Sequence, residues 1–219
     1  PGVPGVPPAK VVVIGAGAAG SNAVQVAAGL GADVTVFDVS IDCLAHIDAL
    51  YRGTIKTCYS IPLPLAEAVA DADLVIGALL VPGKLAPKVI TRETVGRMRK
   101  GSVIVDIAID QGGISETSRM TYHSAPLYVD EGVVHYCVPN IPAACARTAT
   151  LALTQATLPY VARLANQGLM AMKGDFGFAA GLQTHDGHVA HKGLAEDTGR
   201  PHKPYSGLGA GGAKDSKQN

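Results

Sequence analysis

One stretch of the chain decides its fold: Lys10-Val11-Val12-Val13-Ile14-Gly15-Ala16-Gly17-Ala18-Ala19-Gly20. Its β-branched run ends at a glycine, which is typical of a buried strand, and the small residues that follow favour a helix. Three glycines then match the GxGxxG pattern. Gly15 permits a tight turn, Gly17 lets the backbone approach a pyrophosphate, and Gly20 lets the helix pack closely on the strand. The stretch therefore predicts a dinucleotide-binding loop from Gly15 to Gly20.

Strand-like and helix-like segments continue to alternate after this loop. Further strands are expected at Asp33–Phe37, Thr54–Cys58, Leu74–Ile76, Ser102–Asp106 and Val133–Val138. Helices are expected at Ala18–Leu30, Ile41–Leu50, Leu65–Ala70 and from the N-cap Thr91 to about Arg99. Such alternation predicts an α/β fold over residues 10–142, a Rossmann-type doubly wound parallel sheet with helices on both faces.

Asp38 is the acidic residue that a dinucleotide site of this kind needs. It follows the second expected strand, where a carboxylate can accept hydrogen bonds from ribose hydroxyls. The same carboxylate would repel a 2′-phosphate, and no arginine occurs between Val39 and Cys43. The pattern favours NAD over NADP as the cofactor. The alternative is a structural βαβ turn with an ordinary capping aspartate.

Other loops are expected at the same edge of the sheet, because ligands of open α/β sheets bind beyond the carboxyl ends of the strands. Ser60 follows the third expected strand, and Ala78 and Leu79 follow the fourth. Ile107 begins the loop after the fifth strand, and Val138 and Asn140 lie after the sixth. These loops are predicted to converge on one crevice.

Composition narrows the class of protein. The chain of 219 residues is 47% apolar and 16% charged, which is typical of a folded domain. The formal net charge is zero, without a basic stripe, so a nucleic-acid partner is not expected. No apolar run approaches a membrane span. None of the four cysteines form a CxxC pair, and His185, His188 and His191 lack zinc-site spacing, so we expect no metal and a reducing, cytoplasmic setting.

The two ends of the chain differ from its middle. Residues 1–9 are rich in proline and glycine and resemble an interdomain linker, so we expect a segment to precede Pro1. Residues 143–198 are expected to form a helical return segment, with one long helix over Thr148–Gln167 that Pro159 bends or breaks. Residues 199–219 are rich in glycine, proline, lysine and serine and are expected to be disordered.

Several motifs resemble those of bacterial alanine dehydrogenases. They are Ala72-Asp73-Leu74-Val75-Ile76-Gly77-Ala78, Val81-Pro82-Gly83, Gly101-Ser102-Val103-Ile104-Val105-Asp106-Ile107-Ala108-Ile109-Asp110-Gln111-Gly112-Gly113, His135-Tyr136-Cys137-Val138 and Thr150-Leu151-Ala152-Leu153-Thr154. The NAD-binding part of proton-translocating transhydrogenase is a further relative. It shares the glycine loop and the Pro82-Gly83 region, whereas the run from Ile109 to Gly113 resembles alanine dehydrogenase.

The resemblance implies a reaction and roles for particular residues. The reaction is the reversible oxidative deamination of L-alanine by NAD to pyruvate and ammonia. Asp110 would be the catalytic aspartate near the nicotinamide; the alternative is a turn aspartate before Gly112. Asp38 and Ser60 would hold the adenosine half, and Asn140 would contact the nicotinamide end or the substrate. The cofactor would be lined by Ala78, Leu79, Ile107 and Val138.

The same resemblance implies partners. The family's substrate-binding arginine and its catalytic lysine and histidine belong to an N-terminal domain, and family members are often hexamers, so a homo-oligomer is expected. Two departures affect the predicted site: Cys43 stands where a basic residue is frequent, and Pro139 where a small one is usual. A stand-alone NAD-binding module, or a transhydrogenase-like domain without dehydrogenase activity of its own, remains the alternative function.

Overall fold

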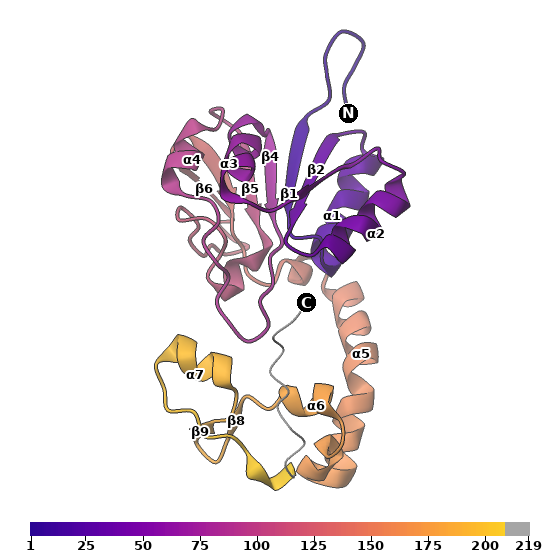
Figure 1. Cartoon of the computed structure of the whole chain (residues 1–219), viewed down its shortest axis with the longest axis vertical. Coiled ribbons are helices and arrows are strands. Elements are labelled where there is room, and N and C mark those ends of the chain that lie inside the picture. Colours follow the sequence, from indigo (N-terminus) through magenta and orange to yellow (C-terminus); the bar gives the residue numbers. More distant parts are fainter. Residues whose placement is uncertain (209–219) are drawn as a thin grey trace. The chain divides into compact units, whose positions relative to one another are not determined.

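A single sheet organises the first part of the chain. The computed structural model describes residues 1–208, which divide into two compact units, Pro1–Ile141 and a second that begins at Pro142. Seven strands of the first unit lie in the order β3-β2-β1-β4-β5-β7-β6. Figure 1 labels β1, β2, β4, β5 and β6 of this sheet. The seven strands are β1 (Lys10–Ile14), β2 (Asp33–Asp38), β3 (Lys56–Tyr59), β4 (Leu74–Gly77), β5 (Val103–Asp106), β6 (Leu127–Asp130) and β7 (Val133–Tyr136). This order is that of a doubly wound Rossmann-type sheet, which confirms the predicted fold class.

Helices cover both faces of this sheet. They are α1 (Ala18–Gly29), α2 (Ile41–Tyr51), α3 (Pro62–Asp71), α4 (Arg92–Arg97) and the short 3₁₀ helix η1 (Ile107–Gln111). Val11 and Val13 belong to the buried cluster that contains Val24 of α1. Val12 and Ile14 belong to the cluster on the other face, which includes residues of α3 and α4. Successive β1 side chains thus alternate between two cores, as expected for a strand covered on both faces.

One strand departs from the predicted all-parallel sheet. β6 pairs antiparallel with β7, with Asp130 opposite Val133. The two strands are joined by Glu131 and Gly132, which have φ of 51° and 77°. Two consecutive positive φ values are those of a tight hairpin turn, which forces the chain to return antiparallel. The sheet is therefore mostly parallel, with an antiparallel edge strand that was not predicted.

The second unit is built mainly from helices. The long helix α5 (Ala146–Gln167) continues through Pro159, so one helix forms and the proline does not break it (Figure 1). The shorter helices are η2 (Ile141–Cys145), η3 (Gly168–Met172), α6 (Phe176–Ala180), α7 (Lys192–Thr198) and η4 (Ser206–Leu208). A two-stranded hairpin, β8 (Thr184–His185) and β9 (His188–Val189), interrupts the expected helical segment. Its turn residues are Asp186 and Gly187, with φ of 47° and 75°.

The segment expected to be a disordered tail begins with placed residues. Val189 and His202 form a parallel bridge, and the Lys203 N–H donates to the Val189 carbonyl at 2.9 Å. The first part of this segment is thus ordered, and residues 209–219 of the predicted tail lie outside the described residues. Among residues 1–208, no helix combines the length and apolar character needed to cross a bilayer.

Candidate functional site

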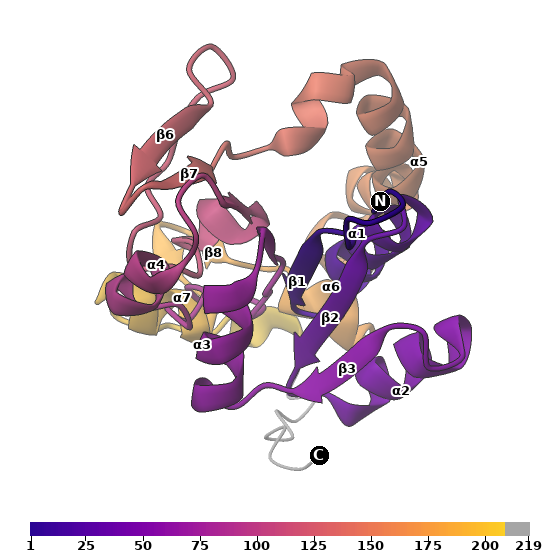
Figure 2. The same cartoon turned by 90° about the horizontal axis from the view of Figure 1, so that it is seen from above.

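The strand register aligns the carboxyl ends of the central strands. Ile14 lies opposite Phe37 on one side and Gly77 on the other, and Gly77 lies opposite Asp106. Figure 2 shows β3, β2 and β1 next to one another in this sheet. The predicted residues Gly15, Ala78 and Ile107 directly follow these aligned positions. The structure therefore brings three of the predicted loops to one edge of the sheet.

Two glycines of the dinucleotide loop are required by the packing of the chain itself. A Cβ on Gly15 would lie 2.6 Å from the Ala78 carbonyl oxygen, and its φ of +103° is one that L side chains rarely adopt. A Cβ on Gly20 would lie 1.7 Å from the Gly15 carbonyl oxygen. Gly15 thus lies against the end of β4, and Gly20 of α1 lies against Gly15. Neither Gly15 nor Gly20 has room for a side chain.

Gly17 differs, because no contact within residues 1–208 requires it to be a glycine. It has a φ of −68°, and a Cβ built there meets no atom within 4 Å. Gly17 also precedes α1, whose first turn receives no hydrogen bond from a capping side chain and contains no acidic residue. The positive end of that helix is thus left open to an anion. The space at Gly17 and the uncapped N-terminus fit a bound diphosphate.

Asp38 lies against the same loop. Its carboxylate accepts hydrogen bonds from the N–H of Ala16 at 2.5 Å and of Ser40 at 2.7 Å. The Ser60 N–H donates to the Asp38 carbonyl oxygen at 2.9 Å, so these two predicted adenosine-side residues are neighbours. The half-buried Asp38 carboxylate is positioned by the backbone and remains able to accept further hydrogen bonds.

Asp110 lies on the other side of the expected crevice. It belongs to η1, directly after β5, and is exposed; no hydrogen bond or ion pair to its carboxylate occurs within residues 1–208. In the preceding loop, the Ala78 N–H donates to the Ile14 carbonyl at 2.8 Å, which ties the end of β4 to that of β1. Leu79 and Ile107 are half-buried beside these ends.

The residues after β7 extend this row by one strand, because β7 pairs parallel with β5 and Tyr136 lies opposite Val105. Val138 is 1% exposed and belongs to the buried core. Asn140 is exposed, in a turn with a φ of +53°, and its carbonyl oxygen lies 3.3 Å from Nε2 of His123. The structure thus places Asn140 after the strand end, without a contact that joins its side chain to the other predicted residues. Pro139 belongs to the same turn and directly precedes this strained position.

Asp106 and Lys88, which lie outside the predicted site, hold the Asp110 loop, that is, residues 107–113. The buried carboxylate of Asp106 accepts hydrogen bonds from Ile114 and Ser118, and the Lys88 ammonium donates to the carbonyls of Gly112 and Ser115. Asp106 is the last residue of β5, as Asp38 is of β2. Its place at a strand end is therefore the feature of the sequence that could have pointed to it.

His135 lies in β7, within the strand expected from the sequence, and is fully buried. Its Nε2 lies 2.8 Å from the Thr117 hydroxyl and its Nδ1 2.9 Å from the Val133 carbonyl. Since a carbonyl only accepts, Nδ1 carries the proton, and Nε2 accepts from Thr117. The ring stacks on Tyr128 at 4.8 Å. Burial lowers the pKa of His135, so the neutral ring is favoured and its role is structural.

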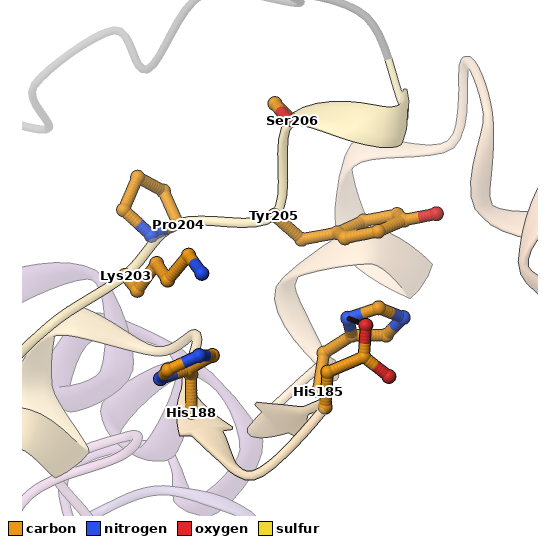
Figure 3. Close-up of a pocket in the computed structure, with 7 residues that line it drawn as sticks. His185, His188, Lys203, Pro204, Tyr205 and Ser206 are labelled. Carbon is orange, nitrogen blue, oxygen red and sulfur yellow. Dashed lines mark ion pairs between the residues drawn. The ribbon is translucent and has the colours of Figure 1, made fainter.

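The second unit contains a pocket. In it the rings of His185 and Tyr205 lie 4.4 Å apart, and Nδ1 of His185 lies 3.3 Å from a carboxylate oxygen of Asp186 (Figure 3). The lining residues are His185, Asp186, His188, Lys203, Pro204, Tyr205 and Ser206. None of them was selected as a site residue.

Fold and site together define the first unit as a nucleotide-binding domain of the Rossmann type. Comparison with known proteins then assigns the chain more narrowly. Residues 1–192 match the family described as "Alanine dehydrogenase/PNT, C-terminal domain". The chain belongs to this family, which confirms the resemblance seen in its motifs.

Individual relatives agree with this assignment. An alanine dehydrogenase of Halomonas elongata is 56% identical over 200 residues, which are 91% of this chain and 54% of the relative. A solved L-alanine dehydrogenase is 46% identical, with a TM-score of 0.78, over 90% of this chain and 55% of that one. A transhydrogenase from Sinorhizobium meliloti is 30% identical, with a TM-score of 0.67, over 85% of this chain and 51% of that one. The chain thus spans about half the length of these relatives.

Proposed function

We propose that this chain supplies the NAD-binding half of an alanine dehydrogenase. The reaction is the reversible conversion of L-alanine, NAD⁺ and water into pyruvate, ammonium, NADH and a proton. Gly17 supports the cofactor part of the proposal, because no atom of residues 1–208 fills the space beside it and no side chain of those residues caps the N-terminus of α1. When bound, NAD accepts the hydride from the substrate; all other steps depend on protein groups.

The residues of this chain would divide the cofactor between them. The loop from Gly15 to Gly20 holds the diphosphate through backbone N–H groups and the end of α1. Asp38 accepts hydrogen bonds from the adenosine ribose and repels a 2′-phosphate, with Ser60 beside it. At the other end of the crevice, Ala78, Leu79 and Ile107 line the nicotinamide side.

Asp110 is the proposed catalytic residue of this half. Its exposed carboxylate has no partner within residues 1–208, so it is free to contact substrate. There it would orient the attacking water in deamination, or ammonia in the reverse reaction, and stabilise the positive charge of an iminium-like intermediate. The groups that bind the alanine carboxylate would come from the N-terminal domain that the resemblance implies, and Val138 and Asn140 would complete the nicotinamide side.

A graft tests the dehydrogenase part of this proposal. The matching residues of the Halomonas elongata alanine dehydrogenase are replaced by those of this chain, and NADH production is followed with L-alanine and NAD. We expect turnover by the graft and little or none by the 219-residue chain alone. A folded graft that binds NAD but does not oxidise alanine would contradict the proposal and favour a stand-alone or transhydrogenase-like NAD module.

A further inference from the structure

The Asp106 carboxylate is placed where a charge is costly. It is fully buried at the end of β5, with 0% of the residue exposed. One oxygen, Oδ2, accepts the Ile114 N–H at 2.8 Å and the Ser118 hydroxyl at 2.6 Å. The other, Oδ1, has no partner among the described residues. A buried polar atom without a partner costs free energy, so the position needs a reason beyond simple packing.

The two hydrogen bonds to Oδ2 close the Asp110 segment into a loop. Asp106 and Ile114 flank residues 107–113, and their bond joins the two ends of that segment. Within it, the Gly113 N–H donates to the Ala108 carbonyl at 3.0 Å. Gly113 has a φ of +76°, and a Cβ there would lie 2.6 Å from Asp106 Oδ2. The turn that ends the loop is therefore built closely around this one oxygen.

The same carboxylate faces the neighbouring strand. A Cβ on Gly77 would lie 2.5 Å from the Ile114 side chain and 3.4 Å from Asp106 Oδ1. Gly77 directly precedes Ala78, which contacts the dinucleotide loop at Gly15. Asp106 thus holds the Asp110 loop against the end of β4, beside the cofactor loop.

Lys88 holds the outer side of the same loop. Its ammonium donates to the Ser115 carbonyl at 2.9 Å and also to the Gly112 carbonyl. Both contacts lie near the end of the loop, on the side open to solvent, because Lys88 is exposed. The inner attachment through Asp106 is shielded from water and is therefore the stronger constraint on where the loop lies.

We propose that Asp106 is a positioning residue, which fixes the place of Asp110 by joining the two ends of its loop through a single oxygen. The assignment of a catalytic role to Asp110 rests on the proposed function, whereas the clamp itself does not. Because both hydrogen bonds go to the same oxygen, an amide oxygen can accept both, and the amide nitrogen then takes the place of Oδ1. The proposal thus predicts that Asp106→Asn keeps the Asp110 loop in place and that Asp106→Ala does not.

Hydrogen exchange of the 219-residue chain tests the clamp without any need for turnover. Asp106→Ala is expected to raise the exchange rate of the amides in residues 107–114 by about tenfold or more, with Asp106→Asn close to the unmodified chain. Ser118→Ala removes one of the two hydrogen bonds to Asp106, so it should raise the exchange rate of these amides by less than Asp106→Ala does. If Asp106→Ala fails to fold, Ser118→Ala provides the test in its place. The matched control is Asp71→Asn, a carboxylate before β4 that pairs with Lys10 and Arg99. Unchanged exchange in residues 107–114 of Asp106→Ala and Ser118→Ala would overturn the clamp.

Turnover of the graft tests the consequence for Asp110. Asp106→Ala is expected to lower kcat by about tenfold or more while the KM for NAD changes about twofold at most, and Asp106→Asn should restore kcat. If Asp106→Asn lowers kcat as much as Asp106→Ala does, the charge or proton of Asp106 matters and the positioning role is wrong. If the unmodified graft is inactive, the proposed function fails, and hydrogen exchange still decides on the clamp.

Discussion

The carboxylate of Asp38 accepts a hydrogen bond from the backbone N–H of Ala16 at 2.5 Å, which joins the end of β2 to the dinucleotide loop. The residue proposed to hold the ribose therefore also shapes the loop that holds the diphosphate. Removal of the Asp38 carboxylate would therefore remove both the proposed ribose contact and the hydrogen bond from Ala16.

Replacement of Asp38 by alanine should change which cofactor binds. Without the carboxylate, NAD is expected to bind about tenfold more weakly, as for the loss of a hydrogen bond to a charged group. NADP should be affected less, because the repulsion of its 2′-phosphate is relieved. Calorimetric titration of both cofactors measures the ratio. Asp33→Ala, at the other end of the same strand, is the control, and an unchanged ratio in Asp38→Ala would remove Asp38 as the ribose ligand.

Gly17→Ala should separate cofactor binding from folding. The structure has room for the new Cβ, so the thermal unfolding midpoint should hardly change. NAD binding should weaken by about tenfold or more, equivalent to about 1.4 kcal/mol, because the methyl group occupies space proposed for the diphosphate. Gly20→Ala should instead lower stability by about 1–3 kcal/mol or more, since its Cβ would overlap the backbone. A Gly17→Ala chain with unchanged NAD affinity would show that the space has another use.

Asp110→Asn should affect chemistry rather than binding. In the graft, kcat for alanine oxidation is expected to fall on the order of 100-fold, because the side chain can no longer take part as a carboxylate. The dissociation constant of NAD should stay within about threefold, since Asp110 is proposed to face the substrate. Steady-state kinetics and calorimetry of the same sample provide both numbers. Near-normal kcat would exclude Asp110 from the mechanism.

Because of His135, the free energy of unfolding of the first unit should fall as the pH is lowered. Burial lowers its folded-state pKa below the ordinary value of 6.5, so the unfolded chain binds more protons in the pH range between the two values. Its contribution is complete above pH 6.5 and is lost as the pH falls towards the folded-state pKa. Near the ring, Asp130 and Asp106 oppose this shift and Arg119 adds to it.

Thermal unfolding at pH 7.5 and pH 5.5 measures this effect. His135→Phe leaves the Thr117 hydroxyl without its acceptor and should cost about 1–3 kcal/mol at either pH. Its unfolding midpoint should nevertheless change less between the two pH values than that of the unmodified chain. His46→Gln, an exposed histidine of α2, is the control and should keep the original pH dependence. Equal pH dependence in His135→Phe would assign the acid sensitivity to other groups.

Local patterns were sufficient to predict the central sheet. Val11 to Ile14 and the glycines after them specify a buried strand and a tight turn through the residues themselves. β6 was missed, because its hairpin needs a positive φ at Glu131, a residue that rarely adopts it. Contacts from distant segments stabilise that turn: Arg92 pairs with Glu131, and Lys100 donates to its carbonyl. By contrast, the Asp186-Gly187 turn carries a strong hairpin signal that the expected helical segment obscured.

The site could be predicted only where a motif fixes the backbone. Gly15 and Gly20 have the tight packing that the motif predicts, and Asp38 lies against the same loop, whereas its proposed contact with the ribose stays a prediction. Asp106 could not be distinguished from other strand-end carboxylates, because its role depends on Ile114 and Ser118 folding back onto it. Only the three-dimensional arrangement shows that the Asp38 carboxylate bonds to the loop after β1, whereas the Asp106 carboxylate bonds to Ile114 and Ser118.

Titration of the purified 219-residue chain with NAD and NADP by calorimetry tests the central claim most directly. The account predicts one NAD bound per chain, and NADP bound about tenfold more weakly or worse because Asp38 repels its 2′-phosphate. A folded chain that binds neither cofactor, or that prefers NADP, would contradict it.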